Sequence, residues 1–380
     1  MNVALYLKHF PAAGSPLLGG TAIAVHGLAS GLAANGAAVT VLCEGPQRRS
    51  TWSEAGYAIE CFPNLAPYRS FRLAPELKRY VGERLTPSRS VCLVNGMFHP
   101  AAYAMGRLLR ARGIPYVAVP HDPYERSVFR RNRHLKWPYW FLFERRLLKH
   151  AAAIQVLDGR HAECLRRLGL EVPVIEAPNG IDPAAVPPCS SLQWRGREAQ
   201  PMALVFLGRL DAYHKGLDLL LAAVAQLVPE LDLRLTLQGP DWGDRPTLTR
   251  QAQALAIADR VSFREPDYRR PAPELIAAHD VFCLPSRFEG FGLAALEAML
   301  AARVLLVSEG AGIASHVRTA GCGLAVPPTV AGIKAGLRTL AKRRAEWKDM
   351  GLSGRRYALA RFQWKAIAAD ALARYARLLA

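Results

Sequence analysis

"DVFCLPSRFEGFGLAALEAML", residues 280–300, contains a complete strand–loop–helix unit. Its first part, VFCL, is a short apolar run without charge, which is typical of a strand buried in a parallel sheet. Two glycines follow in the loop, and the apolar stretch that begins near Gly292 favours a helix. The stretch therefore predicts one unit of an α/β fold, in which each parallel strand leads into a helix.

Similar apolar runs recur along the chain and alternate with amphipathic stretches such as GLDLLLAAVAQLV, residues 216–228. In the first half they are NVALYL, AVTVLC, VCLVNG, YVAVP and AIQVL, and in the second half MALVFLG, LRLTLQG, DVFCLPS and RVLLVSEG. This alternation predicts doubly wound parallel sheets. A chain of 380 residues is long for one core and suits two such domains. The polar, proline-containing stretch from 183 to 201 is the expected boundary.

Composition limits the class of protein. The chain is 51% apolar and 21% charged, which indicates a folded globular protein. Its seven cysteines are far apart and form no CxxC pair, so we expect reduced thiols in a cytoplasmic protein, without disulfides or a zinc site. MNVALYLKHF lacks the features of a signal peptide, and glycines interrupt the longest uncharged span. The net charge of +18 implies anionic partners.

Ligands of doubly wound sheets bind in the loops that follow the carboxyl ends of the strands. In FLGRLDAYHKG, residues 206–216, Arg209 follows a predicted strand, and Lys215 stands just before Gly216 and a helix. Two cations at this place can hold a diphosphate, and a guanidinium can do so with two hydrogen bonds. Ordinary solvated surface charges remain the alternative.

EGFGLAALE, residues 289–297, combines two carboxylates with a glycine loop. Glu289 opens the loop, the N–H groups of Gly292 and Leu293 point out of the first helical turn, and Glu297 lies about 7 Å further along the helix. The order of acceptor, donors and acceptor matches a nucleotide-sugar, whose hexose hydroxyls, diphosphate and ribose hydroxyls follow one another. Glu289 would then accept from the hexose, and Glu297 from the ribose.

These residues resemble family 4 of the glycosyltransferases, enzymes of the GT-B fold. EGFGLAALEAM is similar to the E-x7-E signature of that family, and GRL…KG to its diphosphate-binding Arg and Lys. Three further stretches resemble family elements in the same order: LLGGTAIAVHGLASGLAANGAAVTVLCE (17–44), PNGID (178–182) and RFQWKAIAADALARYARLLA (361–380). One departure is EGAGIASHV (309–317), where the family has a Gly-Gly-x-x-Glu loop.

The resemblance implies an architecture of two doubly wound Rossmann-like domains facing each other across a cleft. Residues 1–185 would form the acceptor domain and residues 200–360 the nucleotide-sugar domain. Residues 361–380 would form a helix that returns to the first domain.

The resemblance also implies a set of site residues. His121, in YVAVPHDPY, would face the transferred sugar, although a hydrogen bond in a turn with Asp122 and Pro123 is the alternative. Gly19 and Gly20 would bring backbone N–H groups towards the diphosphate or the acceptor. The expected catalytic residues are His121, Arg209, Lys215 and Glu289. The expected donor-binding residues are Gly19, Gly20, Arg209, Lys215, Glu289, Gly290, Phe291, Gly292, Leu293 and Glu297.

The implied reaction is retaining transfer of a hexosyl group from a nucleotide-diphosphate sugar to a hydroxyl of a glycan or lipid-linked acceptor, as in polysaccharide biosynthesis. The chain has no DxD triplet, so we expect no metal, and no cofactor besides the nucleotide-sugar substrate. A nucleotide-sugar epimerase or hydrolase of the same fold is the closest alternative. VLLVSEGAGIAS (304–315) approaches a dinucleotide fingerprint, but its third small residue is wrong and no acidic residue follows at the required distance.

Residues 125–150, ERSVFRRNRHLKWPYWFLFERRLLKH, form the most basic part of the chain. They hold eight Lys or Arg and two Glu, with aromatic residues between them. Such a composition suits single-stranded nucleic acid or an anionic membrane surface. A helix with aromatic residues in the core and arginines outside is the third interpretation. A nucleic-acid binder has no use for paired Glu residues beside a phosphate site, so we expect no nucleic acid and a protein peripheral to the membrane at most.

Overall fold

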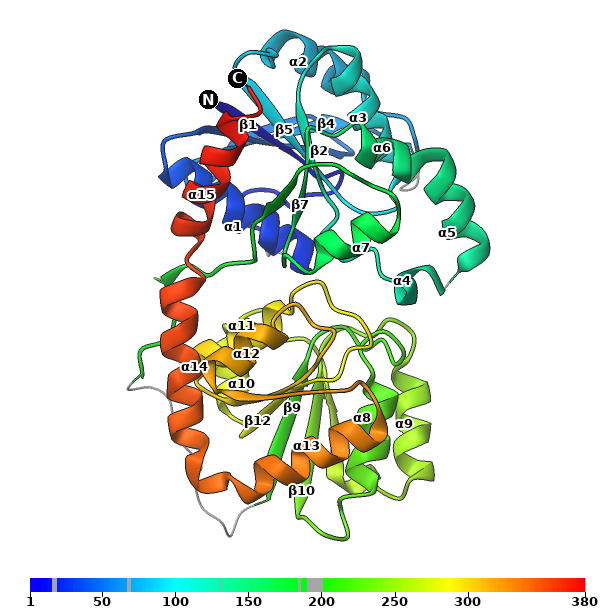
Figure 1. Cartoon of the computed structure of the whole chain (residues 1–380), viewed down its shortest axis with the longest axis vertical. Helices are drawn as coiled ribbons and strands as arrows, with labels where there is room; N and C mark the ends of the chain where they lie inside the picture. The colour runs from blue at the N-terminus through cyan, green and yellow to red at the C-terminus, as the bar shows by residue number, and fades with distance from the viewer. Residues whose placement is uncertain (16–18, 67–69, 131, 184–185, 190–200, 380) are drawn as a thin grey trace. The chain divides into compact units, whose positions relative to one another are not determined.

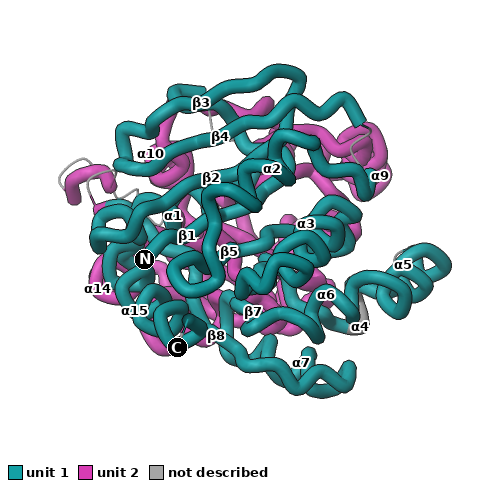
Figure 2. The backbone as a smooth tube through the Cα atoms, turned by 90° about the horizontal axis from the view of Figure 1, so that it is seen from above, with its two compact units in different colours: residues 1–182, 362–380 teal, residues 183–361 magenta. Residues whose placement is uncertain are grey.

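The computed structural model describes residues 1–15, 19–66, 70–130, 132–183, 186–189 and 201–379. The chain divides into two compact units, each built around one sheet (Figure 1). Unit 1 comprises Met1–Asp182 and Phe362–Ala380, and unit 2 comprises Pro183–Arg361 (Figure 2). The first segment of unit 1 therefore ends at Asp182, directly before residues 183–201, which were expected to separate two domains.

The sheet of unit 1 has the strand order β3-β4-β2-β1-β5-β6-β7-β8, and all pairs are parallel except β3 with β4. Its strands are β1 (Asn2–Tyr6), β2 (Ala38–Gly45), β3 (Arg49–Trp52), β4 (Ala58–Pro63), β5 (Ser90–Asn95), β6 (Tyr116–Val119), β7 (Ala153–Val156) and β8 (Val174–Glu176). The five strands predicted from apolar runs are confirmed. Sequence analysis missed β3, β4 and β8, which carry polar residues or are very short.

Helices cover both faces of this sheet, so two apolar clusters form the core, one on each side. The helices are α1 (Gly20–Ala34), α2 (Pro75–Arg84), α3 (Pro100–Ala111), α4 (Arg126–Arg130), α5 (Arg133–Tyr139), the π-helix η1 (Trp140–Glu144), α6 (Arg145–Lys149), α7 (His161–Arg167) and α15 (Trp364–Ala376). The last of these packs on the first at Gly27, where an added Cβ would lie 2.1 Å from the Trp364 indole.

Unit 2 has a fully parallel sheet with the order β11-β10-β9-β12-β13-β14. Its strands are β9 (Met202–Leu207), β10 (Leu233–Gln238), β11 (Val261–Arg264), β12 (Val281–Leu284), β13 (Val304–Ser308) and β14 (Gly323–Val326). The helices are α8 (Leu217–Ala225), α9 (Arg245–Ala254), α10 (Ala272–Ala277), α11 (Leu293–Leu300), α12 (Ala314–Ala320), α13 (Val330–Lys342) and α14 (Trp347–Arg361), with 3-10 turns at Ala258–Arg260 and Arg344–Glu346.

The order of strands in each sheet reverses direction at one place. In unit 2 the chain starts at β9, moves outward through β10 to β11, and then returns to β12 on the other side of β9. In unit 1 the corresponding place lies between β1 and β5. Ligands of doubly wound sheets bind at such a switch point, because the loops after the two neighbouring strands diverge there.

Candidate active site

Two loops meet at the switch point of unit 2. Residues 208–216 follow β9, and residues 285–292 follow β12, the neighbouring strand. At Gly216 the backbone has φ of 65°, and an added Cβ would lie 2.2 Å from the Pro285 carbonyl oxygen. Only glycine permits this approach, so the two loops touch directly. The Arg287 backbone N–H also donates to the His214 carbonyl oxygen at 3.0 Å.

An arginine that sequence analysis did not select fixes these loops. The Arg287 guanidinium donates to both carboxylate oxygens of Asp218 at 2.8 and 2.7 Å and to the Tyr213 carbonyl oxygen at 2.7 Å. The hydrogen bonds with the Asp218 carboxylate raise the pKa of Arg287 above its usual value. This bidentate contact stabilises the site before a ligand binds.

Lys215 and Glu289 form an ion pair at the centre of the site. The Lys215 Nζ lies 2.6 Å from the Glu289 Oε2, and the two side chains are only 12% and 14% exposed. Burial opposes ionisation of Glu289, but the charge and hydrogen bond of Lys215 outweigh it, so the pKa of Glu289 is lowered. The Ser286 hydroxyl also donates to Oε2, at 3.1 Å. Sequence analysis assigned Lys215 and Glu289 to different parts of the ligand, whereas in the structure they also pair with each other through Oε2, because a carboxylate this buried needs a partner.

The loop that departs from the family pattern supports the glycine loop. The Gly312 N–H donates to the Glu289 carbonyl oxygen at 3.3 Å, and the Ile313 N–H donates to the Phe291 carbonyl oxygen at 2.9 Å. An added Cβ at Gly312 would lie 2.3 Å from the Gly290 carbonyl oxygen. Gly312 thus serves packing between the two loops, which gives a structural reason for one glycine of the dinucleotide-like stretch.

Helix α11 begins where the sequence predicted it. Gly292 is its N-cap residue, with φ of 100°, and Leu293 is its first helical residue. No side chain caps this end, and the Ala295 N–H bonds to the Gly292 carbonyl oxygen, which leaves the N–H groups of Leu293 and Ala294 for an anion. The Phe291 side chain is buried, so only its backbone can reach a ligand.

Glu297 lies one turn further along α11 and is half-buried. Burial raises its pKa from 4.5 to about 7, because nothing charged compensates for the lost hydration. Near neutral pH this carboxyl group therefore exists in both protonation states.

Arg209 packs against an aromatic side chain that sequence analysis missed. Its guanidinium lies 4.3 Å from the centre of the Trp242 ring, and Trp242 is 62% exposed. Stacking on a ring leaves the N–H groups in the guanidinium plane available for a phosphate. Within the described residues Arg209 forms no ion pair, in contrast to Lys215.

His121 follows β6 in unit 1, and its backbone has a positive φ of 67°, a strained conformation for this residue. Its Nε2 lies 2.8 Å from the Asn95 Oδ1, while the Asn95 Nδ2 donates to the Tyr6 carbonyl oxygen at 3.1 Å. An oxygen facing Nε2 requires the proton on that nitrogen, so Nδ1 carries the lone pair. Burial lowers the pKa of His121 to about 4, so the ring is neutral.

Asn95 was not selected from the sequence, although it is the only polar residue at the end of the apolar run VCLVN. It occupies the carboxyl end of β5, beside the switch point of unit 1. Gly19, with φ of 93°, precedes α1 at the same edge of the sheet, and Gly20 is the first residue of that helix. An added Cβ at Gly19 would meet no atom within 4 Å, so the backbone there is accessible.

The predicted residues therefore fall into two groups. Unit 2 gathers most of them around its switch point: Arg209, Lys215, Glu289, Gly290, Phe291, Gly292, Leu293 and Glu297. Unit 1 holds Gly19, Gly20 and His121 at the carboxyl edge of its own sheet. Over the described ranges, no three His, Cys, Asp or Glu side chains are grouped as metal ligands.

Two family models match the chain, one on each unit. The model described as Glycosyltransferase Family 4 matches residues 18–185, and the model described as Glycosyl transferases group 1 matches residues 201–343. Among curated proteins, the MMP alpha-(1->4)-mannosyltransferase of Mycolicibacterium hassiacum is 32% identical over 47% of this chain and 43% of its own length. The chain thus spans less than half the length of that relative.

Solved structures resemble the whole chain. Sucrose-phosphate synthase from Thermosynechococcus elongatus superposes with a TM-score of 0.81 at 21% identity, covering 99% of this chain and 98% of that one. The Anabaena protein HepE, in complex with UDP and glucose, superposes with a TM-score of 0.74 at 18% identity, covering 99% and 100%. The fold is that of these proteins, and the two consecutive family matches show that the chain belongs to the family 4 glycosyltransferases, with the GT-B fold.

Proposed function

We propose that this protein is a retaining, metal-independent glycosyltransferase. It would move a hexosyl group from a nucleotide-diphosphate sugar to a hydroxyl of a glycan or lipid-linked acceptor. The observation that carries the proposal is the buried Lys215–Glu289 pair, 2.6 Å apart, in the loops next to the uncapped N-terminus of α11. An ammonium group and free N–H groups at one switch point suit a diphosphate.

The donor would be held along α11. The N–H groups of its first turn and the Lys215 ammonium would bind the diphosphate, together with the Arg209 guanidinium. The Glu289 carboxylate would keep Lys215 in place through Oε2 and offer Oε1 to a hexose hydroxyl. Glu297, further along the helix, would accept hydrogen bonds from the ribose hydroxyls.

Transfer breaks the bond between the anomeric carbon and the diphosphate oxygen, and the leaving group takes the electron pair. Cations and N–H dipoles fixed before the reaction stabilise that negative charge without reorganisation. The acceptor hydroxyl forms the new bond on the face that the diphosphate leaves, and its proton goes to the departing phosphate. His121, neutral and held by Asn95, would accept a hydrogen bond from a sugar hydroxyl at Nδ1.

Relatives support a nucleotide-sugar donor. HepE was solved with UDP and glucose, and the Mycolicibacterium relative is named a mannosyltransferase. We therefore expect one of the UDP-, GDP- or ADP-hexoses to raise the melting temperature of the purified protein. Saturation at a hundred times Kd stabilises a folded protein by about 2.7 kcal/mol. The Arg209→Ala variant is expected to lose most of that shift.

Failure of every nucleotide-sugar to stabilise the protein would contradict the proposed donor site. Product analysis by NMR then separates the alternatives within the fold. A transferase gives a glycoside with the anomeric configuration of the donor, whereas a hydrolase gives the free sugar and an epimerase a new nucleotide-sugar.

We also infer that residues 125–150 hold the protein on an anionic membrane surface. The segment divides into α4, α5, η1 and α6, with Pro138 inside α5. Phe129 and Trp140 are buried, but Trp137 is 38%, Phe141 61% and Leu142 51% exposed. Exposed apolar side chains among arginines and lysines suit the interface of a bilayer that contains anionic lipids. Over the described part of the chain, none of the helices is both long and apolar enough to cross a membrane.

Vesicle flotation tests this inference. The wild-type protein is expected to float with vesicles that contain phosphatidylglycerol and to stay behind with pure phosphatidylcholine. The double variant Trp137→Ala, Phe141→Ala should reduce the floating fraction severalfold. Trp52→Ala is the matched control, because Trp52 is 69% exposed on the edge strand β3. Equal flotation of wild type and double variant would exclude this surface.

A further inference from the structure

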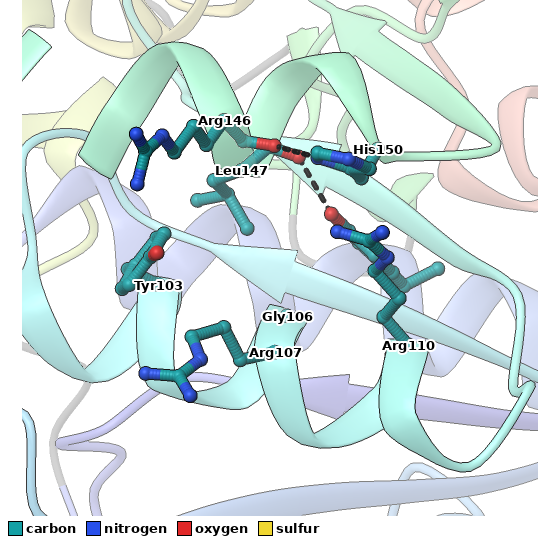
Figure 3. Close-up of a pocket in the computed structure, with 8 residues that line it drawn as sticks. Tyr103, Gly106, Arg107, Arg110, Arg146, Leu147 and His150 are labelled. Atoms are coloured by element: carbon teal, nitrogen blue, oxygen red, sulfur yellow. Dashed lines mark hydrogen bonds between the residues drawn. The ribbon is translucent and has the colours of Figure 1, made fainter. Parts of the chain in front are cut away.

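A second cationic site lies in unit 1, between α3 and α6 (Figure 3). It is a cavity of about 300 Å³, lined by Tyr103, Gly106, Arg107, Arg110, Tyr116, Arg146, Leu147 and His150. Residues 103, 106, 107 and 110 lie three or four positions apart, so they share one face of α3. Gly106 lets the helices approach, since an added Cβ there would lie 2.4 Å from Leu147 Cδ1.

The Tyr116 hydroxyl at the floor of the cavity already has a hydrogen-bond partner, whereas the walls of the cavity carry positive charges. The Tyr116 hydroxyl donates to the Leu147 carbonyl oxygen at 2.6 Å, so the floor offers no unpaired group. Arg107, Arg110 and Arg146 are exposed and form no ion pair with any described residue. The Arg338 side chain, which is 40% exposed, instead pairs with Glu230, 2.7 Å away.

Three guanidinium groups around one small cavity repel one another. No carboxylate among the lining residues compensates for this repulsion. An anion bound in the cavity would do so, and phosphate matches guanidinium groups best, because each can donate two parallel hydrogen bonds. The Tyr103 side chain beside Arg107 offers a further donor in its hydroxyl group (Figure 3).

This cavity is separate from the proposed donor site. Tyr116 is the first residue of β6, and His121 follows the opposite end of the same strand. The four residues of β6 alone span about 10 Å. The cavity thus lies towards the amino-terminal edge of the sheet, away from the loops at the carboxyl edge that hold Gly19 and His121.

We propose that the cavity between α3 and α6 binds a phosphate group of a phosphorylated ligand, independently of the donor site. The phosphate can belong to a soluble phosphate ester or to the headgroup of a phospholipid. Either source places the same chemistry between Arg107, Arg110 and Arg146. The proposal does not depend on glycosyl transfer, so it can fail or hold without affecting the proposed function.

The test is a titration of the full chain with glycerol 1-phosphate, followed by ³¹P NMR at low salt. All proteins carry Arg209→Ala, which removes a guanidinium from the proposed donor site. The added double variant Arg107→Gln, Arg146→Gln is expected to weaken binding about tenfold or more. The control double variant Arg79→Gln, Arg89→Gln removes two exposed charges of unit 1 that lie outside residues 125–150 and do not line the cavity, and it should bind like its parent.

A second arm uses vesicles with and without phosphatidylglycerol. If the Arg107→Gln, Arg146→Gln variant loses binding only to anionic vesicles, the ligand is a lipid headgroup and the proposal stands. If it loses binding to glycerol 1-phosphate, the soluble source is supported. Equal binding by this variant and by the control in both arms overturns the proposal. Circular dichroism verifies folding, which we expect to be unchanged because the replaced side chains are exposed.

Discussion

Lys215→Met is expected to lower kcat/KM about 100- to 1000-fold, the effect of removing one preorganised group that stabilises charge in a transition state. Glu289, in the loop that precedes α11, fixes the Lys215 ammonium group at 2.6 Å. The same change removes the partner of a carboxylate that is only 14% exposed. We therefore also expect a loss of about 2 kcal/mol in the free energy of unfolding.

The double variant Lys215→Met, Glu289→Gln separates catalysis from stability. It leaves no unpaired charge, so the free energy of unfolding should return most of the way to the wild-type value. Turnover should stay low, because the ammonium group is still absent. Arg338→Met is the matched control: its pair with Glu230 is 2.7 Å long but 40% and 45% exposed. Such an exposed pair contributes little to stability, and its loss should leave kcat/KM unchanged. Wild-type turnover in Lys215→Met would refute the assignment.

Much of the fold could be predicted because parallel strands are buried on both faces. All apolar runs that were selected became strands, but the order of the strands, and with it the switch point, was not predicted. The strands that were missed are those that lack this burial. Residues 49–52, RSTW, form an edge strand with mostly exposed side chains, and the residues of β11 alternate between half-buried and exposed. Such strands form by pairing with a neighbour that the local sequence does not reveal.

The candidate site was located by the same logic, since each selected loop follows a buried strand. Its internal contacts could not be predicted. Arg287 and Asp218 are 69 positions apart in the sequence, and Lys215 and Glu289 are 74 apart. Sequence analysis treated each charge as facing a ligand. Burial instead required the charges to pair with one another, and that requirement appears only once the two loops are placed side by side.

The exposure of side chains in the basic segment, residues 125–150, could not be predicted from the sequence either. Its aromatic residues were expected either in the core or on a membrane-facing surface, and in the structure some are buried and others are exposed. Trp140 is buried and Phe141, the next residue, is 61% exposed. A π-helix at this place shifts the side chains relative to an α-helix, so the period of an ideal helix does not predict their faces.

Glu297→Gln is expected to weaken binding of the nucleotide-sugar about 10- to 100-fold, because a hydroxyl group loses a charged acceptor. The same variant should be more stable than the wild type at pH 8. In the folded protein burial raises the pKa of Glu297 from 4.5 to about 7, so the folded state binds more protons than the unfolded state between these values. The stability that this protonation contributes is present below pH 4.5 and is lost as the pH rises through 7.

The glutamine has no such titration, so the difference in free energy of unfolding between variant and wild type should grow by about 2 to 3 kcal/mol between pH 5 and pH 8. Chemical denaturation at both pH values measures it, and Glu274→Gln, on the exposed surface of α10, is the control. If Glu297 serves donor binding at a cost in stability, the Glu297→Gln variant must be more stable than the wild type and must bind the donor more weakly. If Glu297→Gln instead destabilises the protein at pH 8 and leaves donor affinity unchanged, the carboxylate serves the packing of α11, and the ribose contact has to be sought elsewhere.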